Sequence, residues 1–327
     1  MGAPFYDLNG NGIYEPLLGE TPGLANADQA IWFVCNDLNM GRTASLYGSP
    51  PIGIELQVTM WGYNRSDALG QAFFRRYRFI NKSGALFDSV FVAQWSDTDI
   101  GNGGDDFAGC DSVLNLGYAY NGYPADQEFQ KFNVPPPAVG YDLLQGPAVP
   151  SPGNTAVFDF KKRPDYKNLP MTSFTAFATG GSVSDPVLRD YDGTLMWYNM
   201  LNGYIPDEDT SRQISYIHGS GPLAGKPTKF WLNGDPVFGT GDIDGQGNNR
   251  SPGARRIVLS SGPFTMQPGD TQEVIVAVVG GIGESNLLSV KQMKENDRMA
   301  QGAYDNLFEF VPTAVQFAAS PDYLSES

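Results

Sequence analysis

Polar and apolar residues alternate along two stretches of the first hundred residues. Residues 54–60 read IELQVTM, with every second residue apolar, which is the period-two pattern of a half-buried strand. Residues 71–84 show the same alternation, with Phe73, Tyr77 and Phe79 on one face and Arg76 and Arg78 on the other. Residues 85–97 (ALFDSVFVAQWSD) are apolar on both faces in their middle, which predicts a central strand. The short connections predict that these three strands form an antiparallel meander.

The last third of the chain carries two further patterns. Residues 255–281 predict a strand, a short second strand, a Pro-Gly-Asp turn and a fully apolar strand that must pair inside a sheet. Residues 284–310 carry apolar side chains at helical spacing and predict one long helix. Its apolar positions are Leu287, Leu288, Val290, Met293, Met299, Ala303 and Leu307.

The middle of the chain is less periodic. Residues 133–154 (NVPPPAVGYDLLQGPAVPSPGN) are rich in proline, and we expect an ordered surface excursion here rather than regular sheet. Residues 155–160 and 171–181 read as short strands, and 190–204 as a short helix or irregular segment. The predicted fold is mainly β: a large antiparallel β-sandwich with long loops and one C-terminal α-helix. We expect residues 1–311 to form a single extended unit, which could divide into two packed lobes near 120–155, and 312–327 to form a tail.

Charge and composition narrow the class of protein. The formal net charge of −15 argues against a nucleic-acid partner, because phosphate binding needs a basic face. It argues equally against an anionic membrane surface, and no apolar run approaches the roughly 20 residues of a membrane helix. The 39 glycines, 24 prolines and 13% aromatic residues fit β structure with many turns. No signal peptide is visible, which does not by itself argue for a cytoplasmic location.

Motifs of common enzymes are missing from the sequence. There is no Walker loop, GxSxG, HExxH or Rossmann fingerprint. A catalytic triad or a histidine-based zinc site would depend wholly on His218, the only histidine, which lies in no motif. We therefore expect a structural or adhesion role rather than catalysis.

The most acidic segment follows the third predicted strand. Residues 96–112 read SDTDIGNGGDDFAGCDS, and crowded carboxylates repel one another unless a cation lies among them. Oxygen ligands without histidine or thiolate select calcium over zinc. We predict calcium ligands at Asp97, Asp99, Asp105, Asp106 and Asp111. The alternatives are a solvated acidic loop, or the paired acid and nucleophile of a glycosidase, which would need one carboxylate in an apolar pocket.

Two other loops resemble cation sites more weakly. Residues 7–16 (DLNGNGIYEP) place Asp7, Asn9, Asn11 and Glu15 like the first half of a calcium loop, but the closing twelfth-position glutamate is replaced by Leu18. An Asx turn explains the same residues. In residues 241–256, Asp242, Asp244 and Asn248 also favour a turn over a cation site. Aromatic residues such as Trp61, Tyr63, Trp197 and Tyr198 could line a sugar platform, although core packing is the commoner role.

Several of these segments together resemble a known group of proteins. DLNGNGIYEP, YRFINKSGALFDSVFVAQWSDTDIGNGGDDFAGCDSVLNLGYAYNG, PPAVGYDLLQGP, LSSGPFTMQPGDTQEVIVAVVGG and AYDNLF occur in this order. Together they resemble large secreted or cell-surface proteins that Gram-negative bacteria export by the type IX secretion system. The resemblance spans most of residues 3–310 and implies export, an extracellular or cell-surface location and bound calcium.

Function follows from the resemblance only in outline. We expect a calcium-stabilised extracellular surface, structural or adhesion protein, which could assemble with other copies of itself. The alternative is a carbohydrate-binding module or a glycoside-active enzyme with an extracellular glycan as partner. An extracellular location also favours a disulfide between Cys35 and Cys110, whereas the apolar segment around Cys35 reads as a buried strand that would hold a free thiol.

Overall fold

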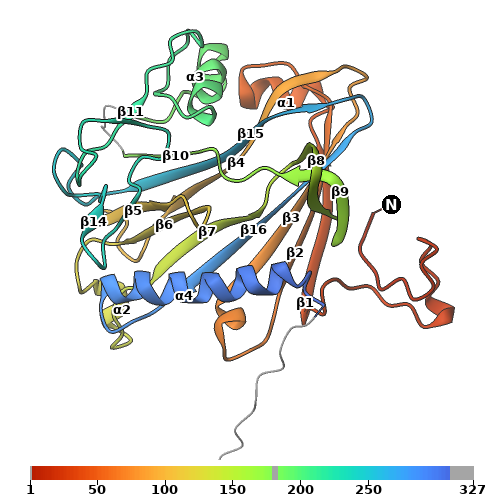
Figure 1. The fold of residues 1–327 in the computed structure, drawn as a ribbon, viewed down its shortest axis with the longest axis horizontal. Coiled ribbons are helices and arrows are strands. Elements are labelled where there is room, and N and C mark those ends of the chain that lie inside the picture. Colours follow the sequence, from red (N-terminus) through yellow and green to blue (C-terminus); the bar gives the residue numbers. More distant parts are fainter. Residues whose placement is uncertain (1, 179–182, 310–327) are drawn as a thin grey trace, which may run out of the picture.

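The computed structural model describes residues 2–178 and 183–309 and is dominated by a seven-stranded antiparallel sheet (Figure 1). Its strand order is β1-β2-β3-β16-β7-β6-β5. The strands are β1 (Gln29–Asn36), β2 (Ile54–Gly62), β3 (Ala72–Asn81), β16 (Thr271–Gly281), β7 (Ala138–Gln145), β6 (Leu116–Asn121) and β5 (Asp106–Asp111). The apolar strand β16 pairs with both β3 and β7, which confirms that it lies inside the sheet.

A smaller sheet of three strands packs on one face of the large one. Its order is β10 (Ser173–Phe177), β15 (Arg255–Met266) and β4 (Phe87–Thr98). Ile257 and Leu259 from β15 and Phe174 from β10 meet Val274 and Val276 from β16 in the core between the two sheets. This arrangement is the predicted sandwich, because the inner faces of two sheets supply one apolar layer.

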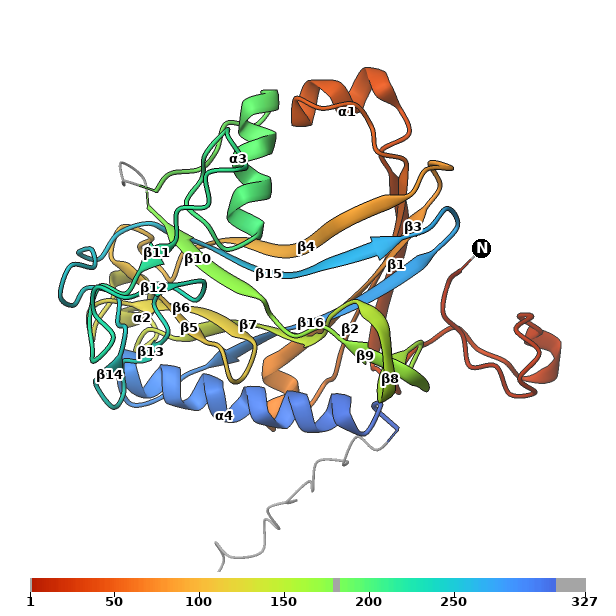
Figure 2. The ribbon, with the colours of Figure 1, turned by 45° about the horizontal axis from the view of Figure 1, so that its top comes forward.

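The long helix α4 (Asn286–Asp305) covers the opposite face of the large sheet, so the molecule has three layers (Figure 2). Ala300, Ala303 and Tyr304 from α4 pack against Ile275 and Ala277 of β16. The Ser285 hydroxyl caps the helix by accepting a hydrogen bond from the Leu288 amide. The predicted C-terminal helix is therefore confirmed.

Shorter elements surround the layers. They are α1 (Met40–Tyr47), α2 (Gln127–Gln130), α3 (Tyr191–Leu201), the 3-10 turns η1 (Pro16–Leu18) and η2 (Ala68–Gln71), and the paired strands β8 (Ala148–Phe158) and β9 (Lys161–Asn168). Four two-residue strands follow: β11 (Tyr216–Ile217), β12 (Pro227–Thr228), β13 (Gly234–Asp235) and β14 (Thr240–Gly241). Helix α3 lies within the segment predicted as a short helix.

Two predictions about the sheets are wrong. Within residues 2–178 and 183–309, β4 pairs only with β15 and is the edge of the small sheet, so it is not a central strand of a meander with β2 and β3. Its middle is apolar on both sides because one side meets the large sheet and the other meets α3, where Phe91 contacts Tyr198. The segment 133–154 is not free of regular sheet, since β7 lies between β16 and β6 and the chain continues into β8. Its prolines fall before β7, between the two strands, and in β8, which pairs with β9 and with no other strand of the described residues.

The predicted disulfide is also wrong for a single chain. Both cysteines are free thiols, with Cys35 exposed and Cys110 buried. Cys35 lies in β1 and Cys110 in β5, the two opposite edges of the seven-stranded sheet. Six strand spacings of about 4.8 Å separate these edges, far beyond the reach of a disulfide.

The C-terminal tail 312–327 lies outside the described residues. Just before it, Phe308 is fully buried and its ring packs against Trp61, Phe74 and Phe160. The chain after α4 therefore closes the apolar layer of its own domain at this point.

Candidate metal centre

The loops at one end of the sandwich bring four carboxylates into one neighbourhood. Asp99 follows the end of β4, and Asp105 and Asp106 stand where β5 begins. The fourth is Asp126, the N-cap of α2, whose carboxylate accepts a hydrogen bond from the Asn102 amide at 3.0 Å. Asp126 thus ties α2 to the acidic loop, and the negative charges of Asp99, Asp105 and Asp126 all act on Asp106.

Asp106 is the buried member of this cluster. Its side chain is fully buried, and one oxygen, Oδ2, accepts a hydrogen bond from the Ile100 amide at 2.9 Å. The other oxygen, Oδ1, is buried without a hydrogen-bond partner. Burial, followed by the charges of neighbouring carboxylates, raises the pKa of Asp106 to about 7. A buried carboxylate oxygen without a donor is costly, and a cation would relieve that cost.

Glycines allow the carboxylates to lie against the loop backbone. Gly101 has a φ of +73°, and a Cβ placed there would come within 2.3 Å of Asp126 Oδ1. A Cβ at Gly103 would come within 2.0 Å of Asp99 Oδ1. Any other residue at Gly103 would displace Asp99, so the glycine-rich composition of this loop follows from the crowding of acidic side chains.

Neutralising groups are missing from the cluster. Within the described ranges, none of Asp99, Asp105, Asp106 and Asp126 forms an ion pair with lysine or arginine. Asp105 accepts a hydrogen bond from Asn121 Nδ2 at 2.8 Å, and burial raises its pKa. As they stand, no three acidic, histidine or cysteine side chains of the described residues converge closely enough to hold an ion. Chelation would require rotation of the exposed Asp99 and half-buried Asp105 towards Asp106.

The structure separates the other two predicted ligands from this cluster. Asp97 lies 3.1 Å from Arg256 Nε. Asp111 stands at the far end of β5, about 17 Å along the strand from Asp106, and its Oδ2 lies 2.9 Å from Lys294 Nζ. Both carboxylates are neutralised by basic side chains. Asp126 carries no metal-like signal in the sequence, since a single aspartate before a Gln-Glu pair is typical of a helix cap.

The N-terminal loop does bring Asp7, Asn9, Asn11 and Glu15 together, through hydrogen bonds among themselves. Asp7 accepts from the amides of Gly10, Asn11 and Gly12, and these bonds, led by that from Gly12, lower its pKa. Asn9 and Asn11 each donate a side-chain hydrogen bond to Glu15 Oε2, at 2.8 and 2.7 Å. This is the bonding of a polar turn, and calcium binding at this loop stays a prediction.

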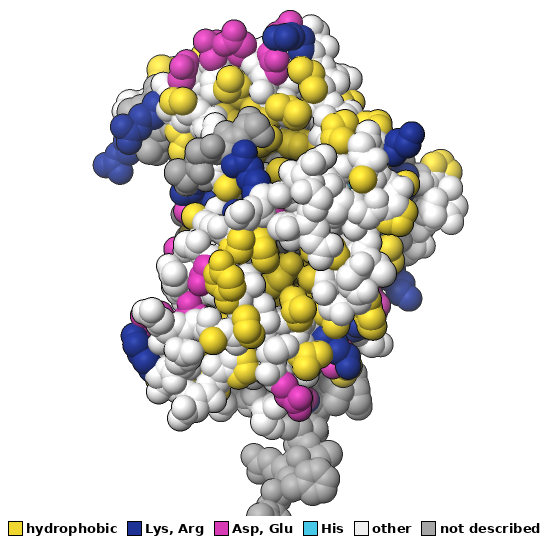
Figure 3. All heavy atoms as spheres, turned by 90° about the vertical axis from the view of Figure 1, so that its left-hand side faces the viewer, with side chains coloured by type: hydrophobic (Ala, Val, Ile, Leu, Met, Phe, Trp, Pro, Cys, Tyr) yellow, Lys and Arg dark blue, Asp and Glu magenta, His cyan; other side chains and the backbone are white. Residues whose placement is uncertain are grey.

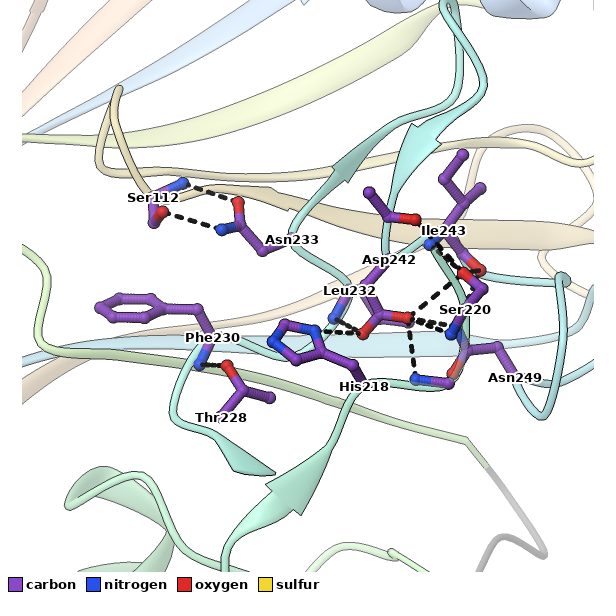
Figure 4. Close-up of polar contacts among 12 residues, drawn as sticks. Ser112, His218, Ser220, Thr228, Phe230, Leu232, Asn233, Asp242, Ile243 and Asn249 are labelled. Atoms are coloured by element: carbon purple, nitrogen blue, oxygen red, sulfur yellow. Dashed lines mark hydrogen bonds and ion pairs between the residues drawn. The ribbon is translucent and has the colours of Figure 1, made fainter. Parts of the chain in front are cut away.

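The third acidic loop is held together by hydrogen bonds rather than left open for a ligand (Figure 4). Asp242 is buried, and its two oxygens accept from the amides of Gly219, Ser220 and Leu232 and from the side chain of Asn249. His218 Nδ1 lies 3.2 Å from Asp242 Oδ2. Ser220 also bonds to Asp242 rather than to His218, so the three residues do not form a nucleophile–base–acid relay.

Asp244 of the same loop has a similar role. It pairs with Arg255 Nε at 2.7 Å and accepts from the Ala108 amide at 3.0 Å. The turn predicted for this segment therefore joins β5 to β15 through the buried Asp244.

The aromatic side chains considered for a sugar platform are mostly in the core. Trp61 and Tyr63 are buried under α4, and Trp197 packs edge-on against Phe177. Only Tyr198 is exposed, and its hydroxyl donates to the Ser89 carbonyl oxygen at 2.9 Å. These four residues do not share a surface.

The surface at the candidate metal end of the molecule is partly apolar. Figure 3 shows hydrophobic side chains gathered across the middle of this face, with charged side chains mainly around its margins. Exposed aromatic residues on nearby elements include Tyr123 after β6, Phe132 after α2 and Phe238 between β13 and β14. Among the described residues, none of the helices combines the length and the apolar character that crossing a membrane requires.

Comparison with known proteins adds no relative to this picture. No protein-family model matches the chain, and no curated protein matches it in sequence.

Proposed function

We propose that this chain is a calcium-stabilised extracellular structural or adhesion domain. The observation that carries the proposal is the cluster of Asp99, Asp105, Asp106 and Asp126, in which a buried Asp106 oxygen lacks a partner. Carboxylate and carbonyl oxygens on a flexible loop are the ligands that calcium prefers. In this role the ion would join the end of β4, the start of β5 and α2, and would act on stability rather than on a reaction.

Exposed sheet edges support an assembling role. β1 pairs with β2 on one side, and within the described part of the chain no strand pairs with its other side. Ile31, Phe33 and Val34 on this strand are all at least 40% exposed. Long apolar edge strands associate with other strands unless they are protected. A second copy of the chain is the partner that this edge would accept most simply.

Calcium removal tests the proposal directly. Purified protein in EDTA should unfold at a lower temperature than protein in millimolar calcium, because a ligand bound only by the folded state stabilises it. At calcium about 100-fold above the dissociation constant, the gain in unfolding free energy would be about 2.7 kcal/mol. Asp106→Asn and Asp126→Asn should reduce this calcium-dependent gain.

A matched control distinguishes ligation from net charge. Glu295→Gln removes one negative charge from an exposed position on α4 and should leave the calcium response unchanged. Equal melting temperatures in calcium and EDTA, together with metal-free purified protein, would overturn the proposed site.

A further inference from the structure

The two sheets enclose a cavity that the metal site and the assembly edge do not involve. Its volume is about 270 Å³, just below the roughly 300–1,000 Å³ of most small-molecule sites. It is open to solvent. Its wall is formed by β4 and β15 of the three-stranded sheet and by β2, β3, β16 and β7 of the seven-stranded sheet.

Apolar side chains from both sheets form most of the wall. Leu56, Tyr77 and Phe79 come from β2 and β3, while Val274 and Val276 come from β16. From β4, Val92 and Gln94 stand opposite Ser261 and Leu259 of β15 and therefore face the large sheet. A ligand in this space would be enclosed mainly by hydrocarbon.

Among the described residues that line the cavity, Arg75 is the single charged one. Its Nε is buried without a hydrogen-bond partner, and its Nη1 reaches only the Tyr77 hydroxyl, at 3.4 Å. No aspartate or glutamate of the described residues lies within ion-pair distance of it.

The guanidinium carbon of Arg75 lies 5.0 Å from the centroid of the Phe73 ring, so what the group lacks is an acidic partner. The neighbouring arginines differ from it in this respect. Arg76 and Arg78 lie on the same strand but point to the opposite face of the sheet from Arg75, and both are paired with Asp159 and Glu273. The chain has a net charge of −15, yet this half-buried guanidinium has no carboxylate beside it. It can therefore pair with the carboxylate of a ligand. Guanidinium groups bind carboxylates through two parallel hydrogen bonds.

We propose that this cavity binds a small apolar monocarboxylate, with Arg75 pairing with its carboxylate and the inter-sheet wall enclosing its hydrocarbon part. A medium-chain fatty acid has this chemistry. The inference goes beyond the proposed structural role, and it does not require the metal site.

Decanoate is a suitable probe, with decan-1-ol as its uncharged match. Isothermal titration in EDTA, which prevents recruitment of the carboxylate by calcium, should detect decanoate binding to the full chain at one site. Decan-1-ol should bind at least about tenfold more weakly than decanoate, since it lacks the charge that Arg75 would pair with. Equal binding of the two probes would overturn the role of Arg75 without any substitution in the protein.

Variants locate the site. Arg75→Gln should weaken decanoate binding at least tenfold. Arg163→Gln, which removes an equal charge from β9 outside the cavity, should leave the binding unchanged. Val92→Phe should fill the cavity and weaken binding while Arg75 remains. The proposal would be overturned if the wild type bound no detectable decanoate, or if a folded Val92→Phe variant bound it fully. It would also be overturned if a peptide with an apolar carboxy-terminus bound more tightly than decanoate and displaced it.

Discussion

Two buried acids, Asp142 on β7 and Asp297 on α4, set a residue-scale constraint on the pH range of this fold. Both are about 1% exposed. Both oxygens of Asp142 and Oδ1 of Asp297 are buried without a hydrogen-bond partner, and we predict that a proton shared by the two carboxyl groups supplies the missing bond. Burial first, and then the charge of its partner, raises the pKa of Asp142. Burial raises the pKa of Asp297 to about 7.

Stability should consequently fall as pH rises from about 4 to 8. The folded state holds protons that the unfolded chain, with pKa values near 3.8, has already released, and stability decreases with pH wherever the folded state binds more protons. Asp142→Asn should flatten this dependence and raise the free energy of unfolding at pH 8 by about 2 kcal/mol. Urea unfolding at pH 5 and pH 8 measures both effects, with Glu295→Gln as the control. An unchanged slope in Asp142→Asn would contradict the shared proton.

At the scale of elements, the docking of α4 depends on a buried charge as well as on apolar contacts. Lys294 is 5% exposed, and its ammonium lies 2.9 Å from Asp111 and 3.2 Å from Asp235, above the ring of Tyr118. One lysine thereby joins the helix to β5 and β13. The carboxylates it neutralises are themselves about three-quarters buried.

Replacing this lysine should loosen the helix. Lys294→Gln should lower the free energy of unfolding by about 3 kcal/mol, because it leaves two buried carboxylates without their counter-charge. Lys291→Gln is the matched control on the same helix: Lys291 is exposed and, among the described residues, pairs only with Glu295 at 3.8 Å, so its loss should cost about 0.5 kcal/mol or less. Equal effects of the two substitutions in chemical denaturation would show that the buried charges are not what holds α4.

At the scale of the whole molecule, the edge strand β1 governs the proposed assembly. Ile31→Lys and Val34→Lys place a charge on each face of this strand, and we expect both to shift the protein towards monomer in sedimentation or light-scattering measurements. Leu17→Lys makes the same change at a 99% exposed position in η1 and should leave assembly unchanged. A wild-type protein that stays monomeric at high concentration, or edge variants that assemble as before, would count against assembly through β1.

The sequence by itself determined the elements whose surroundings are simple. Alternation identified β2 and β3, an apolar run identified β16, and helical spacing identified α4, because each of these patterns reflects burial against one or two flat neighbours. It also located the acidic loop, since repulsion among close carboxylates depends on composition alone.

Tertiary structure decided which strands pair and which carboxylates meet. β4 looks central in sequence because its middle is apolar on both faces, but it is an edge strand: one face packs on the large sheet, and the other meets helix α3 at Phe91 and leaves Trp95 exposed. Asp126 joins the cluster from another loop, while Lys294 and Arg256, both far along the chain, neutralise Asp111 and Asp97. The opposite edges occupied by Cys35 and Cys110 are likewise a matter of strand order. Local patterns report burial, whereas pairing is a property of distances between segments far apart in the sequence.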